Sequence, residues 1–284
     1  MNIIGVIGAG VMGRGVAQTL ASSGFQVILL DKSTDILQSA QEEVRNKLRM
    51  TAMFNRNKIP KEDMELTLAR ISYTTEYEQL EQAEFIIENV TENWDVKKEV
   101  YNKIDRVCSK ESIFAVNTSC LPITRIAALT ERPDRIIGIH FMNPVPMIAA
   151  VEAIKGFHTS PKTIETTRGL LDRMNKEMIL VNDSPGFVAN RLSHLLMNEA
   201  AFVVQDGVAN PSDVDDIFKK CYGHKMGPLE TADLIGLDTV VLSLKVLYED
   251  YQDPKFRCCP LLKKMVDAGL LGRKSGKGFY DYET

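Results

Sequence analysis

Residues 3–31 constrain the fold of this chain most, because they have the pattern of a strand, a glycine turn, a helix and a second strand that ends in an acid. The β-branched run Ile3 to Ile7 is typical of a buried parallel strand. Three glycines then have GxGxxG spacing: Gly8, Gly10 and Gly13. The first permits a tight turn, the second lets a pyrophosphate approach the backbone, and the third lets the helix pack closely on the strand. Because the helix N-terminus then faces the phosphates, the pattern predicts a dinucleotide site.

Asp31 indicates which dinucleotide to expect. It ends the second strand, residues 26–30, where a carboxylate accepts hydrogen bonds from ribose hydroxyls and repels a 2′-phosphate. The expected cofactor is therefore NAD rather than NADP, although the adjacent Lys32 could partly compensate for a phosphate. The alternative is that Asp31 caps the following helix, a role for which Ser33 and Thr34 compete.

Composition excludes several classes of function. Of the 284 residues, 44% are hydrophobic and 25% charged, as in ordinary globular proteins of one large or two medium domains. A net charge of −4 without a long basic run argues against nucleic acid as the main partner. No stretch has the pattern of a secretion signal or a membrane span. The five cysteines lack CxxC spacing, which fits a cytoplasmic protein without a structural metal.

Short apolar runs alternate with amphipathic stretches up to about residue 181. This alternation predicts an α/β fold with a Rossmann-type doubly wound sheet. Beyond the first two strands, a helix is expected at residues 95–107, and further strands are expected at residues 85–90, 113–116, 136–139 and 177–181.

Two interruptions of this pattern set the predicted domain organisation. Residues 183–186, Asp-Ser-Pro-Gly, break the alternation, and the periodicity beyond them is helical. We therefore predict an NAD-binding domain at residues 1–183 and an all-helical domain at residues 184–284, to which the family resemblance described below assigns substrate binding and dimerisation. The polar stretch from Met50 to Arg70 suggests helices or a helical hairpin that projects from the sheet.

Polar residues that follow strands are candidates for chemistry, because ligands of open α/β sheets bind beyond the carboxyl ends of the strands. His140 follows such a strand, and a neutral imidazole can accept the proton of an alcohol while hydride leaves its carbon. Glu152 ends the apolar run 149–151, and a carboxylate on the other ring nitrogen would fix the tautomer and stabilise the imidazolium. An isolated histidine is often a core or surface residue, but the position of His140 after a strand and before Asn143 and Pro144 favours catalysis.

Motifs in a fixed order extend over essentially the whole chain. They are VIGAGVMG (6–13), VNTSCLPIT (116–124), IGIHFMNPVPM (137–147), VEAIKG (151–156), NDSPGFVANR (182–191), MGPLETADLIGLD (226–238) and LGRKSGKGFYDY (271–282). Together they resemble the 3-hydroxyacyl-CoA dehydrogenase family, which includes 3-hydroxybutyryl-CoA dehydrogenases. The resemblance implies that His140 is the general base and Glu152 its partner. It also implies that Ser119 and Asn190 bind the substrate oxygen.

The resemblance extends to the cofactor site, the reaction and the assembly. It implies oxidation of a 3-hydroxyacyl thioester, or the reverse reaction, by a homodimer whose helical second domain covers the substrate cleft. Besides the three glycines and Asp31, the residues expected at the NAD site are Val11, Met12, Glu92, Lys97, Asn143 and Lys274.

Several of these residues have simpler interpretations. Ser119 could be a capping or loop serine ahead of a helix at Pro122. Asn190 could be a polar residue inside a helix that Asp183 or Ser184 caps. The residues Glu92 and Lys97 could be a solvated pair at the start of a helix.

The chain departs from the family pattern where the acyl carrier is held. Ala149 and Ala150 stand where a lysine and a leucine are usual, and Cys120 stands where a second serine is common. The helix after Asp31 has few cations for the phosphates of CoA: Arg45, Lys47, Arg49 and Arg56. We therefore keep two substrates open, a short-chain 3-hydroxyacyl-CoA and a small 3-hydroxyacyl group, such as glyceryl, on an acyl carrier protein. A third alternative is a nucleotide-binding scaffold without catalysis.

Overall fold

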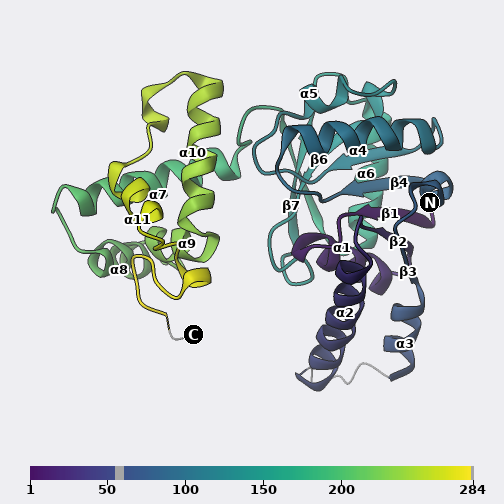
Figure 1. Ribbon diagram of the computed structural model, residues 1–284, viewed down its shortest axis with the longest axis horizontal. Coiled ribbons are helices and arrows are strands. Elements are labelled where there is room, and N and C mark those ends of the chain that lie inside the picture. Colours follow the sequence, from purple (N-terminus) through teal and green to yellow (C-terminus); the bar gives the residue numbers. More distant parts are fainter. Residues whose placement is uncertain (55–60, 283–284) are drawn as a thin grey trace. The chain divides into compact units, whose positions relative to one another are not determined.

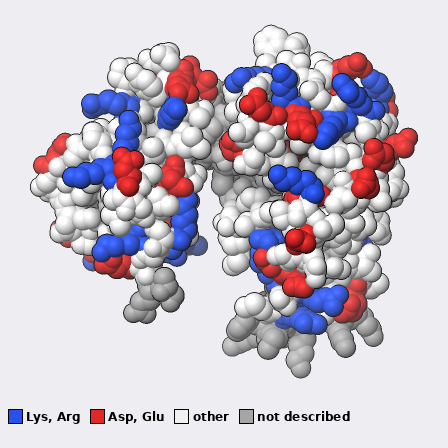
Figure 2. Space-filling view, in the orientation of Figure 1, with Lys and Arg blue, Asp and Glu red and all other residues white. Residues whose placement is uncertain are grey.

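A computed structural model describes residues 1–54 and 61–282, with the side chains of residues 51–54 and 61–62 left aside (Figure 1). The described chain divides into two compact units, Met1–Asp183 and Ser184–Thr284, and each is described here by itself. On the face shown in Figure 2, acidic and basic side chains are interspersed over both units. Within the described ranges, no helix is long and apolar enough to cross a membrane.

The first unit is built on one sheet, to which the described residues contribute eight strands in the order β3-β2-β1-β4-β5-β6-β7-β8. The strands from β3 to β6 in this order are all parallel, β7 is antiparallel to β6, and β8 is parallel to β7. This topology confirms the predicted Rossmann-type sheet. The strands are β1 (Ile3–Ile7), β2 (Gln26–Leu30), β3 (Ile71–Thr74), β4 (Phe85–Glu88), β5 (Ile113–Val116), β6 (Ile136–His140), β7 (Ala150–Lys155) and β8 (Glu177–Asn182).

Helices cover both faces of this sheet because alternate residues of each strand are buried on opposite sides. One face, which includes Ile4, Val6 and Ile139, forms a continuous core with the first, second and sixth helices. On the other face, Phe114 of β5 packs against Tyr101 of the fourth helix, with ring centroids 6.3 Å apart. The helices of this unit are α1 (Val11–Ser22), α2 (Thr34–Phe54), α3 (Lys61–Ala69), α4 (Trp94–Val107), α5 (Ile123–Ala127) and α6 (Pro161–Arg173), with 3₁₀ turns η1 (Tyr77–Gln82) and η2 (Pro133–Arg135).

The polar stretch around residues 50–70 forms parts of α2 and α3, which project from the sheet in the same direction (Figure 1). The prediction of helices for this stretch is therefore confirmed in its described parts, which belong to α2 and α3. Its most polar residues lie outside the described residues: Asn55, Arg56, Asn57 and Lys58.

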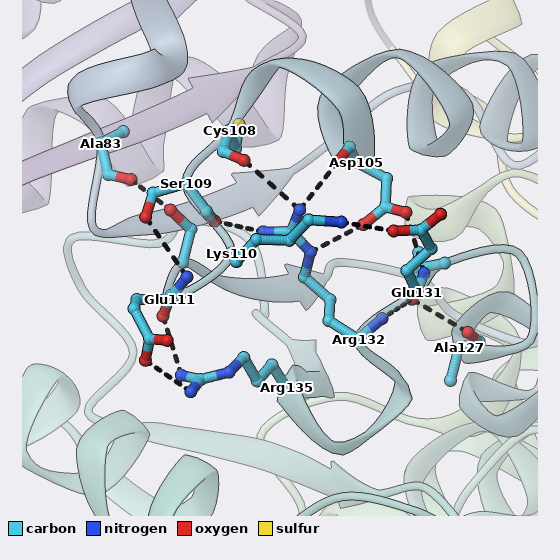
Figure 3. A network of polar contacts seen from close by, with 12 residues as sticks. Ala83, Asp105, Cys108, Ser109, Lys110, Glu111, Ala127, Glu131, Arg132 and Arg135 are labelled. Atoms are coloured by element: carbon cyan, nitrogen blue, oxygen red, sulfur yellow. Dashed lines mark hydrogen bonds and ion pairs between the residues drawn. The ribbon is translucent and has the colours of Figure 1, made fainter.

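A buried arginine closes the C-terminal end of α4 (Figure 3). The Arg132 guanidinium donates to the Asp105 carboxylate at 2.6 Å and to the Asp105 backbone carbonyl at 2.8 Å. It also donates to the carbonyl oxygens of Cys108 and Ser109. These carbonyls lie where a helix leaves acceptors without partners, and a cation there interacts favourably with the helix dipole. Arg132 thus anchors the far end of the helix whose start adjoins the candidate site.

The second unit is helical, as predicted. Its core consists of apolar residues from α7, α9, α10 and α11, with Leu237, Val240 and Leu244 fully buried. The helices are α7 (Ala189–Gln205), α8 (Pro211–Cys221), α9 (Pro228–Ile235), α10 (Leu237–Tyr251) and α11 (Pro260–Asp267), with 3₁₀ turns η3 (Pro254–Phe256) and η4 (Arg273–Ser275).

Two buried carboxylates fasten the C-terminal segment to these helices. Asp233 accepts hydrogen bonds from the backbone N–H groups of Phe279 and Tyr280, and Asp215 accepts one from the Tyr280 hydroxyl at 2.7 Å. A Cβ at Gly278 would lie only 2.1 Å from the Asp233 carboxylate, so glycine is required there. These contacts explain why the 226–238 and 271–282 motifs occur together.

Candidate active site

The pairing of β6 with β7 brings a histidine and a carboxylate together. His140 is the last residue of β6, and its cross-strand partner in the antiparallel β7 is Glu152. Directly opposed residues of an antiparallel pair project on the same face, so their side chains meet. The His140 Nδ1 lies 3.1 Å from the Glu152 Oε2, and the two residues are only 6% and 8% exposed.

This contact determines which ring nitrogen can act as a base. A carboxylate accepts a hydrogen bond from Nδ1–H, and in this tautomer of the neutral imidazole the lone pair is on Nε2. The Nε2 of His140 lies 3.4 Å from the Ser119 Oγ. The three side chains therefore form a row. The His140 Nε2 and the Ser119 hydroxyl lie close enough together to contact the same small polar group of a substrate.

Ser119 lies on the loop that follows β5, and Glu92 holds this loop. The Glu92 Oε1 accepts hydrogen bonds from the Thr118 hydroxyl and from the backbone N–H groups of residues 119–121. Ser119 is a loop serine, as one of its simpler interpretations predicts, but the cap of α5 is Asp183, whose carboxylate binds the backbone N–H groups of Ile123 and Thr124. The Ser119 hydroxyl instead faces His140.

A buried ion pair supports the same loop from below. The Lys97 ammonium lies 2.8 Å from both carboxylate oxygens of Glu88 and donates to the Asn117 carbonyl at 3.2 Å. Desolvation raises the pKa of Glu88, and the Lys97 charge opposes this effect. Both side chains are fully buried, so the interpretation of Lys97 as part of a solvated pair is wrong. Because it is buried, the Lys97 side chain supports the strand ends from beneath and does not line the surface of the cofactor site.

The asparagine side chains at the strand ends are joined. The Asn117 amide donates to the Asn89 Oδ1 at 2.7 Å, and the Asn117 Oδ1 accepts from the Phe141 backbone N–H at 3.4 Å. Asn89, Asn117 and Phe141 directly follow β4, β5 and β6. Glu88 and Asn89 were not predicted as site residues, although a charged residue that ends an apolar strand is a signal that could have identified Glu88.

The glycine loop lies between β1 and α1, and two of its glycines are required by the protein itself. Gly8 has a φ of +89°, and a Cβ at Gly13 would lie 1.7 Å from the Gly8 carbonyl oxygen. Among the described residues, a Cβ at Gly10 would meet no heavy atom within 4 Å. The space beside Gly10, at the N-terminus of α1, therefore fits the close approach of a pyrophosphate.

Asp31 contacts both this loop and the residue that precedes α2, because one carboxylate oxygen faces the loop and the other accepts a hydrogen bond from the Ser33 N–H at 3.3 Å. Its carboxylate accepts a hydrogen bond from the Ala9 N–H at 2.8 Å, whereas the Ser33 hydroxyl accepts from the Ile36 N–H in the first turn of α2. Ser33 is therefore the capping residue, and Asp31 lies at the end of β2 next to the glycine loop. This is the position from which a carboxylate contacts the ribose of a dinucleotide.

Comparisons with known proteins agree with this geometry. Residues 3–184 match the family model of the 3-hydroxyacyl-CoA dehydrogenase NAD-binding domain, and residues 186–282 match that of the C-terminal domain. The chain belongs to the 3-hydroxyacyl-CoA dehydrogenase family. A probable 3-hydroxybutyryl-CoA dehydrogenase of Bacillus subtilis is 44% identical over 278 residues, which cover 98% of this chain and 96% of the relative. The 3-hydroxybutyryl-CoA dehydrogenase of Clostridioides difficile is 42% identical over 98% of this chain and 99% of its own length.

A solved structure is equally similar. The crystal structure of (S)-3-hydroxybutyryl-CoA dehydrogenase from Ralstonia eutropha has a TM-score of 0.96, with 40% identity and complete coverage of both chains. The first unit of this 3-hydroxyacyl-CoA dehydrogenase family member is accordingly its NAD-binding domain.

The remaining expected site residues are distributed over both units. In the dehydrogenase's first unit, Val11 and Asn143 are exposed and Met12 is half-buried. The loop after Asn143 is held by the buried Lys176, which donates to the carbonyl oxygens of Val145 and Ile148 at 2.7 Å. Desolvation lowers the pKa of Lys176.

Asn190 and Lys274 lie in the second unit, each in a defined local setting. Asn190 is in the first turn of α7, where its backbone carbonyl lies 2.9 Å from the His194 Nδ1. The two proposed caps have other partners, since Asp183 binds α5 and the Ser184 hydroxyl lies 2.5 Å from the Tyr251 hydroxyl. The Lys274 ammonium pairs with Asp238 at 2.6 Å.

We expect Gly10→Ala to weaken NAD binding while leaving the thermal unfolding temperature close to that of the wild type. The added methyl group has space in the protein but occupies the volume that the pyrophosphate needs. Titration of protein fluorescence with NADH measures the affinity, and differential scanning calorimetry measures stability. Gly13→Ala is the contrasting control, because its Cβ would collide with the Gly8 carbonyl and lower stability. Unchanged NADH affinity of the Gly10 variant would contradict the assignment of the pyrophosphate to this loop.

Proposed function

We propose that this protein catalyses the NAD-dependent interconversion of short-chain 3-hydroxyacyl-CoA and 3-oxoacyl-CoA thioesters, with 3-hydroxybutyryl-CoA as a typical substrate. The observation that carries the proposal is the row formed by Ser119, His140 and Glu152 at the carboxyl edge of an NAD-binding sheet. When bound, NAD accepts or returns the hydride at C3 of the substrate. The protein must then move one proton and hold one oxygen, and this row supplies groups for both tasks.

His140 serves as the base in the oxidation. Its Nε2 accepts the proton of the 3-hydroxyl group, and Glu152 stabilises the resulting imidazolium through Nδ1–H. The low exposure of the pair strengthens this stabilisation, because charges interact more strongly away from water. In the reduction, the same imidazolium returns its proton to the 3-oxo group.

Ser119 and Asn190 hold the substrate oxygen in this proposal. The Ser119 hydroxyl lies beside the Nε2 that exchanges the proton, so it can donate a hydrogen bond to the same oxygen and fix the direction of proton transfer. The family resemblance supports Asn190 as a second donor. We likewise keep Val11, Met12, Asp31, Asn143 and Lys274 as proposed residues of the cofactor site, with Lys97 beneath it. Glu92 holds the neighbouring loop at residues 118–121.

We expect His140→Gln to lower turnover by about 10³-fold, because a glutamine amide cannot accept the proton in the transition state. NADH affinity should remain close to that of the wild type, since His140 is a base and not a cofactor ligand. The rate is measured by NADH absorbance with acetoacetyl-CoA as substrate.

The matched control is His158→Gln, which changes an exposed histidine in the same unit and should leave the rate unchanged. Equal rates for the His140 variant and the wild type would remove His140 from the mechanism. NADH binding without turnover of any hydroxyacyl thioester by the wild-type protein would instead favour the non-catalytic scaffold.

CoA is the proposed acyl carrier. The relatives named as 3-hydroxybutyryl-CoA dehydrogenases support this choice, as they match over 98% of the chain at 44% and 42% identity. The substitution of Ala149 and Ala150 for larger family residues motivated the carrier-protein alternative. In the structure, the Ala149 carbonyl accepts a hydrogen bond from the Glu177 N–H, so this segment is fixed by its backbone.

We expect acetoacetyl-CoA to be reduced at least about 10²-fold more efficiently, in kcat/KM, than acetoacetyl groups on an acyl carrier protein. Each well-placed contact with the nucleotide handle of CoA contributes on the order of 1 kcal/mol, and a carrier protein lacks that handle. Side-by-side NADH assays with the two thioesters measure the ratio. A preference for the protein-bound thioester would contradict CoA as carrier and would favour a biosynthetic role.

A homodimer formed through the second unit is the proposed assembly. Its helices expose apolar side chains that an isolated subunit would leave in water, including Leu192 of α7, Ile217 of α8 and Leu242 of α10. Sedimentation velocity should give the mass of two chains, and Leu242→Glu should shift the equilibrium toward a single chain. A wild-type mass of one chain at micromolar concentration would contradict the dimer.

The five cysteines, all within the described residues, are free thiols, which supports a reducing cytoplasm as the compartment.

A further inference from the structure

One carboxylate organises the loop that carries Ser119. The Glu92 Oε1 lies 3.1 Å from the Ser119 backbone nitrogen, 3.0 Å from that of Cys120 and 3.3 Å from that of Leu121. It also accepts a short hydrogen bond from the Thr118 hydroxyl. Successive backbone N–H groups that converge on one oxygen form a concave anion site, and here the anion belongs to the protein.

The loop is held from its other end by independent contacts. The Lys97 ammonium binds the Asn117 carbonyl at 3.2 Å, and the Asn117 amide donates to Asn89. These contacts fix residue 117, which directly follows β5, but they do not set the direction in which the chain turns after it. Glu92 sets that direction for residues 118–121.

We propose that Glu92 is a positioning residue that acts through Ser119 and thereby sets the contact between the Ser119 hydroxyl and His140. This inference rests on the proposed function, in which Ser119 holds the substrate oxygen. It differs from the role that the family resemblance implies for Glu92, since substitution of a cofactor ligand would change NAD affinity. Substitution of a positioning residue changes the catalytic step and leaves NAD affinity unaltered.

The physical reason is the demand for accurate placement. The Ser119 hydroxyl lies 3.4 Å from the His140 Nε2, so a small rotation of the loop carries it out of hydrogen-bond range. Without the carboxylate, the N–H groups of residues 119–121 would seek other acceptors, and the loop would rearrange to satisfy them. A displacement of about 1 Å in a catalytic group lowers rates by about 10²-fold.

The test is a double-mutant cycle that combines Glu92→Ala with Ser119→Ala. We expect Glu92→Ala to lower kcat with acetoacetyl-CoA by about 10²-fold, while the NADH dissociation constant stays within about twofold of the wild type. In the Ser119→Ala background, the same substitution should lower kcat by less than about twofold, because the group on which Glu92 acts is absent. Glu92→Gln keeps a neutral acceptor at the same place and should give an intermediate kcat.

Two further measurements separate positioning from other effects. Asp95→Asn removes a carboxylate from the first turn of α4, three residues from Glu92, and controls for the change in net charge. It should leave kcat unchanged. If Glu92→Ala is too unstable to purify, the cycle is repeated with Glu92→Gln, for which the effect on kcat must also vanish in the Ser119→Ala background.

Three outcomes would overturn the proposal. The first is a loss of NADH affinity with unchanged kcat, which would make Glu92 a cofactor ligand. The second is an equal loss of kcat with and without Ser119, which would indicate a general structural role. The third is an unchanged kcat. Failure of the proposed function is distinct, because then the wild-type protein itself would not turn over acetoacetyl-CoA.

Discussion

The pairing of His140 with Glu152 across β6 and β7 is the contact on which the candidate active site depends. The sheet is parallel from β3 through β6, and the reversal at β7 places a carboxylate directly opposite the last residue of β6. Burial of both side chains makes their interaction strong and fixes the imidazole tautomer. Ser119 and the glycine loop lie at the same edge of the sheet, because the carboxyl ends of its parallel strands meet there.

Carboxylates also hold the loops around this edge in place. Each of them accepts hydrogen bonds from backbone N–H groups of a turn or helix start, an interaction that is stronger than a neutral hydrogen bond. Their backbone partners are Ala9 for Asp31, Val90 for Glu88, residues 119–121 for Glu92, and Ile123 and Thr124 for Asp183. Several acids that look like ligand-binding groups in the sequence therefore also have a role in shaping the protein.

Most of the Rossmann-type sheet could be predicted because its strands are short apolar runs with clear ends. The strand at 113–116 has the predicted bounds, and that at 136–140 is longer by one residue. Two strands were not predicted. In β3, only Ile71 and Thr74 are buried, so the apolar pattern is weak. In β7, Glu152 interrupts the apolar pattern, so the sequence shows the end of an apolar run where the strand in fact continues to Lys155.

By itself, the sequence determined the glycine geometry, the acid at the end of β2, the helical second unit and the residue types of the His140–Glu152 pair. These features depend on local backbone conformation and on periodicity, both of which are readable in neighbouring residues. The tertiary structure alone decided that Lys97 pairs with Glu88 under the sheet edge, that Asp183 caps α5, and that Glu92 holds the Ser119 loop. Which residues far apart in the sequence become hydrogen-bond or ion-pair partners depends on which strands and loops the fold brings together. No local sequence pattern encodes these pairs.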